Sequence, residues 1–265
     1  MLGKKRRMNR ILKNGKTLIV PMDHGISKPA KGLEDMDKIL RMVECGADAV
    51  VVHKGIAKNS EYLQKTEMGL IIHLSASTCL INPNDKRIVT SVEKAIELGA
   101  DAVSIHVNVG SATEREQLVE AGRVVETCDS YGMPLLAMMY PRGNGIEVNT
   151  ETVKHAVRVG YELGADIIKT SYTGSTESFM GVVELSAVPV VIAGGSKIPD
   201  IKLLEEVRDA LRAGAVGVAV GRNIFQHTHP DAMVKALRRL IHNDTEVELA
   251  MEVLYERDMA ALHGR

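Results

Sequence analysis

The sequence predicts an α/β protein of the (β/α)8 class, the TIM barrel, in which helices surround a closed ring of eight parallel strands. Three observations predict this fold: the length of 265 residues, a series of short apolar runs, and a four-fold glycine repeat. The length suits one such barrel, since the fold commonly takes about 250 residues. We therefore expect a single domain over residues 1–265, with an extra helix at its C-terminal end.

Eight apolar runs are the expected strands. Each run is nearly continuous in Val, Ile, Leu, Ala or Met, without polar alternation, which is typical of strands buried on both faces of a parallel sheet. In chain order the runs are Thr17–Pro21, Ala49–His53, Leu70–Leu74, Ala102–Val107, Leu135–Met139, Asp166–Thr170, Pro189–Ala193 and Val216–Val220.

Longer segments between these runs have apolar residues at helical spacing. In the first of them, Met36, Ile39, Leu40 and Val43 recur on one helical face. The expected helices are Leu33–Cys45, Glu114–Tyr131, Thr152–Leu163, Ile201–Ala213 and, near the C-terminal end, Thr245–Leu262. We expect this last helix either to cap the barrel or to mediate assembly.

A repeat runs from the end of a helix into every second strand. Its four copies are ECGADAVVVHKG, ELGADAVSIHVN, ELGADIIKTSYT and RAGAVGVAVGRN. Its glycines are expected in the left-handed conformation that ends a helix: Gly46, Gly99, Gly164 and Gly214. Four repeats of two βα units give the eight units of a barrel. An open doubly wound sheet is the alternative, but the Met22–Gly25 turn lacks the glycine fingerprint typical of that fold.

Composition excludes several classes of function. The chain has 33 Lys+Arg against 34 Asp+Glu and only eight aromatic residues, so it lacks the basic excess and stacking surfaces of nucleic-acid-binding proteins. No apolar run approaches the roughly 20 residues that span a bilayer. The widely spaced Cys45, Cys79 and Cys128 favour a reducing, cytoplasmic location. The basic segment 1–7 is expected to be a solvated turn or helix rather than a signal peptide.

The active site of such a barrel lies at the C-terminal ends of its strands. These ends are denser in polar residues than the fold requires. In chain order they are Asp23–His24, His53–Lys54, His73, His106–Asn108, Tyr140–Arg142, Lys169–Ser171, Gly194–Ser196 and Gly221–Asn223.

Three side chains in this set suit acid–base or nucleophilic chemistry. Lys169 follows two isoleucines at the expected mouth of the barrel. Desolvation there would lower its pKa and favour the neutral amine, which can attack a carbonyl. The alternative is a lysine whose charged head group reaches solvent at the rim of the barrel. Lys54 ends its own strand in the same way, so spacing does not choose between them. Asp23 is either a general base or a turn residue. Tyr140 either transfers a proton or only packs.

Two glycine turns and one arginine suit an anionic substrate. Gly194-Gly195 and Gly221-Arg222 follow the seventh and eighth strands, where backbone N–H groups of such barrels usually bind a phosphate. Plain tight turns are the alternative interpretation, and we favour the phosphate. Arg142 is expected to pair with a phosphate or a carboxylate through its planar guanidinium.

Four histidines end the first four strands: His24, His53, His73 and His106. A divalent metal ion bound there would indicate a metal-dependent aldolase. The sequence has no HxxH or HExxH spacing, so hydrogen-bonded histidines are favoured over metal ligands.

Several motifs, in this order, resemble those of archaeal-type class I aldolases over nearly the whole chain. They are LIVPMDHG, VVHKGI, GLIIHLSAST, DAVSIHVNVGS, AMMYPRG, DIIKTSYTG, AGGSK and GVAVGRNIFQH. Within that family they are most similar to the 2-amino-3,7-dideoxy-D-threo-hept-6-ulosonate synthases. The resemblance implies a Schiff-base mechanism, a role in aromatic amino acid biosynthesis, and a homo-oligomer such as a ring-based decamer.

The resemblance also implies residue roles. Lys169 in KTSYTG matches the Schiff-base lysine, Asp23 in PMDHG the proton acceptor, and Tyr140 in MMYPRG the proton donor. The positions that match the lining of the sugar-phosphate site are His24, Gly25, Ile26, Ser27, Pro141, Arg142, Gly194, Gly195, Gly221 and Arg222.

The implied reaction moves a three-carbon unit from 6-deoxy-5-ketofructose 1-phosphate to L-aspartate semialdehyde. Lys169 is expected to attack the C2 ketone of the donor, and this scheme requires neither a metal nor an organic cofactor. Three alternatives remain: fructose-bisphosphate aldolase, a synthase that joins aspartate semialdehyde to dihydroxyacetone phosphate on the way to 3-amino-4-hydroxybenzoate, and the metal-dependent aldolase.

Overall fold

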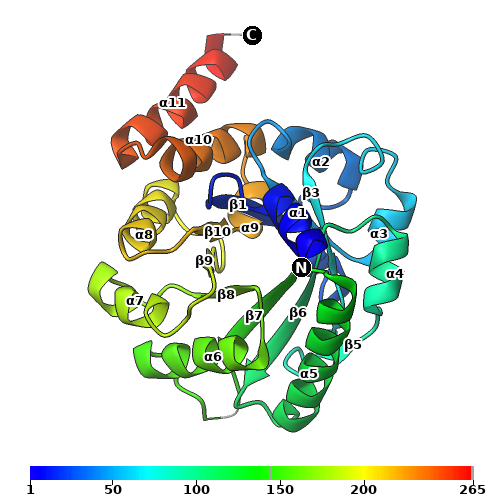
Figure 1. Ribbon diagram of the computed structural model, residues 1–265. Coiled ribbons are helices and arrows are strands. Elements are labelled where there is room, and N and C mark those ends of the chain that lie inside the picture. Colours follow the sequence, from blue (N-terminus) through cyan, green and yellow to red (C-terminus); the bar gives the residue numbers. More distant parts are fainter. Residues whose placement is uncertain (144, 264–265) are drawn as a thin grey trace.

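The computed structural model describes residues 1–143 and 145–263 and contains the expected closed barrel (Figure 1). Its parallel strands are hydrogen-bonded in the circular order β1-β10-β9-β8-β7-β6-β3-β2. All eight predicted runs are confirmed as strands. Their bounds are β1 Thr17–Pro21, β2 Ala49–Val52, β3 Gly69–His73, β6 Ala102–Val109, β7 Leu135–Pro141, β8 Ile167–Ser171, β9 Val190–Ala193 and β10 Gly217–Ala219.

Helices form a ring outside the strands (Figure 1). The predicted helices correspond to α2 Met36–Val43, α5 Glu114–Tyr131, α6 Thr150–Leu163 and α8 Asp200–Arg212. The ring also contains helices that were not predicted: α3 Lys54–Asn59, α4 Val92–Glu97, α7 Thr176–Val183 and α10 Pro230–Asn243. The first two have six residues each, which is too short for a periodic pattern to stand out.

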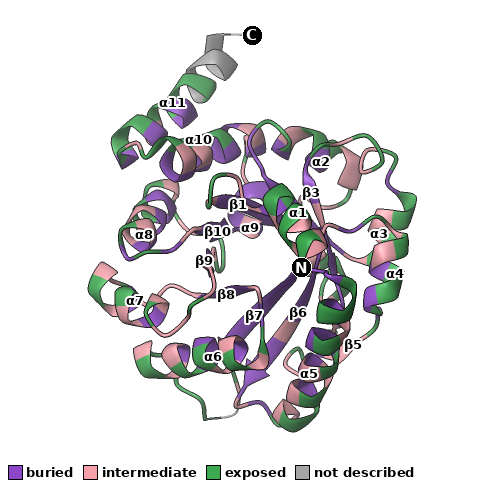
Figure 2. Ribbon diagram, viewed as in Figure 1, coloured by how far each residue is buried: buried purple, intermediate pink, exposed green. Residues whose placement is uncertain are grey.

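The buried residues form two layers, and the strands between them are buried on both faces (Figure 2). The larger layer lies between the strands and the helices. The smaller one fills the interior of the barrel and includes Ile19, Val51, Ile71, Leu136 and Ile167. This double burial explains why the strands read as continuous apolar runs.

The basic N-terminal segment forms helix α1, Leu2–Ile11, which lies across the N-terminal mouth of the barrel (Figure 1). Ile11 is fully buried in the interior cluster. Lys4 pairs with Asp166 at 2.9 Å, and Arg10 pairs with Asp101 at 2.8 Å. The expectation of a helix is confirmed, but a merely solvated one is wrong, because α1 closes this end of the barrel.

The repeat glycines end helices at three of the four expected positions. Gly99, Gly164 and Gly214 have φ values of 80°, 99° and 101°. Gly46 is not left-handed, and the prediction is wrong there. It is needed for packing instead, since a Cβ at this position would lie 2.8 Å from Cγ1 of Val234 on α10.

A small ribbon and two further helices complete the fold. After β3 the chain forms a small antiparallel ribbon, β4 Ser75–Ala76 and β5 Arg87–Ile88, which was not predicted. Helix α9, Arg222–Phe225, follows β10. Helix α11, Val247–His263, packs on α8 and α10 and extends beyond the barrel rather than covering either mouth (Figure 1). No helix in the described residues is long and apolar enough to cross a bilayer.

Candidate active site

An open cavity of about 670 Å³ lies at the C-terminal mouth of the barrel. Most of the predicted site residues line it: Asp23, His24, Ser27, Tyr140, Arg142, Lys169, Gly194, Gly195, Gly221 and Arg222. The other three predicted residues lie outside its lining. Gly25 and Ile26 are exposed on the 3-10 turn η1, Asp23–Ile26, and Pro141 is buried at the end of β7.

Lys169 projects into the barrel from β8. Successive residues of a strand face opposite ways, and Ile167 belongs to the interior cluster whereas Ile168 belongs to the outer one. Lys169 therefore shares the interior face with Ile167, and it is 7% exposed. Lys54 is instead the first residue of α3, where its exposed Nζ donates to the carbonyl of Val89 at 2.5 Å. The tertiary structure thus distinguishes Lys169, which faces the interior of the barrel, from Lys54, which does not, although their spacing in the sequence is alike.

The carboxylate of Asp23 lies among histidines at the start of η1. Its Oδ1 is 3.7 Å from Nδ1 of His24, and its Oδ2 is 3.8 Å from Nε2 of His73. Burial by itself raises the pKa of Asp23, but the charges that His73 and His24 acquire in acid, together with the charge of Lys169, outweigh burial and hold that pKa below its ordinary value. Asp23 is therefore ionised at neutral pH. Its buried Oδ1 has no hydrogen-bond partner among the described residues, so it is free to accept a proton.

The neighbouring histidines are neutral at neutral pH. Burial lowers the pKa of His73 to about 3, against the opposing charge of Asp23. Burial also lowers the pKa values of His24 and His53. Nδ1 of His73 lies 2.7 Å from Oγ of Ser104, which fixes the ring beside Asp23.

Tyr140 is nearly buried in the interior cluster, on β7 next to β8. The guanidinium carbon of Arg142 lies 4.4 Å from the centroid of the Tyr140 ring, a cation–π contact. The ring of His106 lies 5.1 Å away, and its Nε2 is 2.9 Å from Oδ1 of Asn108. Burial, assisted by the charges of Lys86 and Arg142, places the pKa of His106 well below its ordinary value.

The two glycine turns lie together and are joined by Asn223. Its buried side chain donates to the carbonyls of Gly194 at 2.7 Å and Ser196 at 3.1 Å. A Cβ on Gly221 would lie 2.5 Å from the carbonyl oxygen of Pro21, so only glycine fits. Nε of Arg222 is buried without a partner in the described structure. An unpaired guanidinium beside close backbone turns suits an anion.

Lys86 also lines the cavity, and the sequence interpretation missed it. It is 8% exposed and comes from the segment between β4 and β5. Burial lowers its pKa, although the charge of Asp23 opposes this shift. No periodic pattern or known turn surrounds it, so the sequence offered no signal of its place.

The histidines are not arranged as metal ligands. Within residues 1–143 and 145–263, no three His, Cys, Asp or Glu side chains lie close enough together to hold a metal ion. The expected hydrogen bonds are confirmed for His73 and His106. His24 and His53 each keep one buried ring nitrogen without a partner in the described part.

A family model for DeoC/LacD family aldolases matches residues 17–227, which span the barrel from β1 past β10. The chain belongs to this aldolase family. The aldolase is 58% identical over 260 residues, 98% of each chain, to 2-amino-3,7-dideoxy-D-threo-hept-6-ulosonate synthase 1 of Archaeoglobus fulgidus. This similarity confirms the predicted resemblance to archaeal-type class I aldolases.

Two further similarities are informative. The aldolase is 45% identical over 231 residues to 2-amino-4,5-dihydroxy-6-oxo-7-(phosphonooxy)heptanoate synthase of Streptomyces griseus, covering 85% of this chain and 84% of that one. A solved archaeal fructose-1,6-bisphosphate aldolase, with its catalytic lysine covalently bound to the carbinolamine intermediate of its substrate, superposes with a TM-score of 0.84. Its sequence identity is 32%, with 90% of this chain and 99% of that chain covered.

Proposed function

We propose that this aldolase is a Schiff-base synthase of aromatic amino acid biosynthesis. It transfers three carbons from 6-deoxy-5-ketofructose 1-phosphate to L-aspartate semialdehyde and gives 2-amino-3,7-dideoxy-D-threo-hept-6-ulosonate. The observation that carries the mechanism is Lys169, buried on the interior face of β8 in the same cavity as Asp23 and Tyr140. The 58% identity to the Archaeoglobus fulgidus synthase supports the choice of substrates.

The atoms of the reaction fix where Lys169 attacks. The product has a methyl group at C7 and no phosphate, so the transferred unit is C4 to C6 of the donor. The imine therefore forms at the C5 ketone rather than at the C2 ketone expected above. Water leaves as the imine forms. The protonated imine then accepts the electron pair of the C3–C4 bond. Hydroxypyruvaldehyde phosphate is released, and a three-carbon enamine stays on Lys169.

Asp23 and Tyr140 move the protons. The ionised Asp23 accepts the C3 hydroxyl proton as the C3–C4 bond breaks. Tyr140 donates a proton to the aldehyde oxygen of the semialdehyde when the enamine attacks it. Positioned acid–base groups of this kind contribute roughly 10²–10⁴-fold each. Hydrolysis of the new imine frees the product and regenerates Lys169, and the proton held by Asp23 returns through water to the oxygen of Tyr140.

The donor phosphate is assigned to the glycine turns. Gly194, Gly195 and Gly221 let backbone N–H groups approach the phosphate oxygens, and Arg222 adds a guanidinium with an unpaired Nε.

Borohydride reduction tests the mechanism. When the donor and borohydride are added together, we expect a stable adduct on Lys169, located by peptide mass mapping, and activity that a chelator leaves unchanged. Lys169→Arg keeps the charge but forms no Schiff base, so this variant should fold and have no turnover. An adduct on Lys54 or Lys86 instead would contradict the assignment, as would measurable turnover by the variant.

The 45% identity to the Streptomyces griseus enzyme favours a second candidate, a synthase that uses dihydroxyacetone phosphate. The product named for that relative keeps its phosphate, so product mass separates the two reactions. Fructose-bisphosphate aldolase activity is separated by offering glyceraldehyde 3-phosphate in place of the semialdehyde.

We further propose that the enzyme is a single-domain homo-oligomer of the cytoplasm, possessing the ring-based assembly that the family resemblance implies. All three cysteines are free thiols, which suits a reducing compartment. Leu249 and Tyr255 are exposed on α11, which extends beyond the barrel and offers apolar surface to a second copy (Figure 1).

A further inference from the structure

The cavity has a second cationic region on the side of the barrel opposite the glycine turns. In the circular strand order, β3 lies opposite β9 and β6 lies opposite β10. The glycine turns follow β9 and β10, whereas the β4–β5 ribbon follows β3 and packs on β6. Lys86 enters the cavity from this ribbon. The two cationic regions therefore lie across the mouth from each other.

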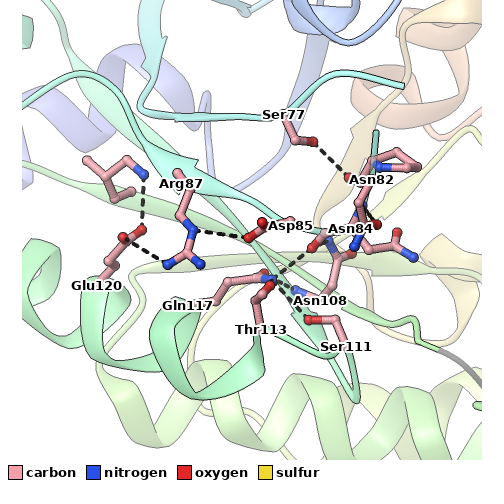
Figure 3. Close-up of polar contacts among 12 residues, drawn as sticks. Ser77, Asn82, Asn84, Asp85, Arg87, Asn108, Ser111, Thr113, Gln117 and Glu120 are labelled. Atoms are coloured by element: carbon pink, nitrogen blue, oxygen red, sulfur yellow. Dashed lines mark hydrogen bonds and ion pairs between the residues drawn. The ribbon is translucent and has the colours of Figure 1, made fainter. Parts of the chain in front are cut away.

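A buried polar network fixes the segment that carries Lys86 (Figure 3). The carbonyl of Asn84 accepts hydrogen bonds from Nδ2 of Asn108 at 3.0 Å and from Nε2 of Gln117 at 2.8 Å. Oε1 of Gln117 accepts from the backbone N–H of Asn108 at 2.8 Å. Asn108 lies on β6 and Gln117 on α5, and both are buried. The segment is thus tied to the barrel two residues before Lys86.

Ion pairs secure the same segment from the other side. Nε of Arg87 lies 3.0 Å from Asp85, and its guanidinium reaches Glu120 on α5 at 3.8 Å. Glu120 also accepts the backbone N–H of Ile88 at 3.0 Å. The residues on both sides of Lys86 are therefore held to α5, and the backbone that carries the lysine is fixed at the rim of the cavity.

The ammonium of Lys86 has no counterion of its own. No hydrogen bond or ion pair of its side chain occurs within the described structure, although the residue is more than nine-tenths buried. Arg142 follows β7, the neighbour of β6 in the barrel, and its backbone N–H donates to the carbonyl of Val109 on β6 at 2.9 Å, so the two cations lie on the same side of the cavity. A buried cation without a partner is costly unless an anion joins it. The cost indicates that the partner is the substrate.

We propose that Lys86, assisted by Arg142, binds the α-carboxylate of the amino-aldehyde acceptor. This inference rests on the proposed function and names the residue that selects the second substrate. In the product, the carboxylate carbon lies five bonds from the carbon bound to Lys169. An anion that far from the imine needs a cation across the mouth rather than beside Lys169. Asn108 and Gln117 act through the loop as positioning residues.

Lys86→Met tests the proposal, because methionine keeps the length of the side chain and removes its charge. We expect kcat/KM for L-aspartate semialdehyde to fall about tenfold or more, mainly through KM, as for the loss of a charged hydrogen bond. With butanal, an acceptor that lacks the carboxylate, the variant and the wild type should be equal. Borohydride trapping of the donor on Lys169 should also be unchanged, and it shows that the variant is folded.

Two matched variants sharpen the test. Lys58→Met removes one charge from the exposed face of α3, and its kinetics should match those of the wild type. Lys86→Arg keeps the charge and should recover part of the lost kcat/KM. Equal losses with butanal and with the semialdehyde would overturn the proposal, and so would a loss confined to donor trapping, which would assign Lys86 to the phosphate.

Product formation by the wild-type enzyme tests the proposed function separately. If the wild type makes no product from L-aspartate semialdehyde, the proposed function is wrong. The role of Lys86 is then measured with whichever donor forms the Schiff base, by comparing succinic semialdehyde with butanal. Loss of the preference for the anionic aldehyde in Lys86→Met supports the role, and an unchanged preference refutes it.

Discussion

Individual side chains at the mouth of the barrel obtain their chemistry from desolvation. His73 would be half protonated near pH 6.5 in water, but burial keeps it neutral, with a pKa of about 3. Asp23 beside it stays ionised, because the charge of Lys169 and the charges that the histidines acquire in acid outweigh its burial. The arrangement gives one ionised carboxylate among imidazole rings that carry no charge at neutral pH.

These shifts predict how stability depends on pH. Between pH 6.5 and about 3 the unfolded chain binds a proton at His73 that the folded chain does not, so the free energy of unfolding falls as the pH falls through this range. Asp23 has the opposite sign of charge, and its lowered pKa adds stability that is lost only at more acidic pH. Denaturant unfolding from pH 7 to 4 should show a shallower slope for His73→Asn than for the wild type.

His155→Asn is the control for this measurement, because His155 is exposed on α6. Its slope should match that of the wild type. An unchanged slope in His73→Asn would show that the buried ring does not resist protonation.

Three of the four repeats carry an aspartate that joins a pair of neighbouring strands, and this is a feature of the elements rather than of the site. Asp48, Asp101 and Asp166 accept the backbone N–H groups of Leu18, Leu70 and Leu135, at 2.7, 2.9 and 2.9 Å. Each hydrogen bond joins the start of one strand to the chain entering the next. The repeated GAD motif is therefore explained by the geometry of the N-terminal mouth.

Asp166→Ala should lower the free energy of unfolding by about 2 kcal/mol, because it leaves the Leu135 N–H and the half-buried Lys4 without this acceptor. Chemical denaturation measures the change. Asp129→Ala removes the other, exposed partner of Lys4 and should cost less than about 0.5 kcal/mol. Equal losses in the two variants would show that the repeat aspartate has no special role.

The elements also show where sequence patterns stop being informative. Strands buried on both faces gave unbroken apolar runs, so all of them were predicted. The β4–β5 ribbon has two residues in each strand, and its segment is held by side chains of β6 and α5. Such non-local contacts leave no periodicity in the sequence, which is why Lys86 was missed.

The whole molecule separates stability from chemistry at its two ends. Helix α1 closes the N-terminal mouth (Figure 1). The cavity opens at the other mouth. Ile11 from α1 fills the bottom of the barrel, and a Cβ on Gly69 would lie 2.7 Å from its Cδ1. Substitutions at the two ends should therefore have different effects.

Ile11→Ala should lower the free energy of unfolding by about 2–4 kcal/mol, as expected for a fully buried isoleucine, while kcat and KM stay at their wild-type values. Thermal or denaturant unfolding and steady-state kinetics on the same preparation measure both. Lys86→Met is the converse, with altered KM and no loss of stability, because the variant removes a buried charge that has no partner in the free enzyme. A loss of kcat in folded Ile11→Ala would show that the two ends are coupled.

The sequence by itself determined the eight barrel strands, the barrel and the aldolase family, because each of these follows from patterns that are local or repeated along the chain. Most of the site residues that it predicted line the cavity, since the ends of parallel strands converge at one mouth. The roles of Lys169, Asp23 and Tyr140 remain predictions that the borohydride experiment tests.

Only the tertiary structure decided which lysines face the cavity. Lys54 and Lys169 follow similar apolar runs, but β2 ends two residues before Lys54, and the chain turns there into α3. Lys169 stays within its strand and keeps the interior face. Lys86 reaches the same cavity through hydrogen bonds to residues on β6 and α5. The direction of a side chain at a strand end depends on where the strand stops and on contacts between distant segments, and neither is encoded in local spacing.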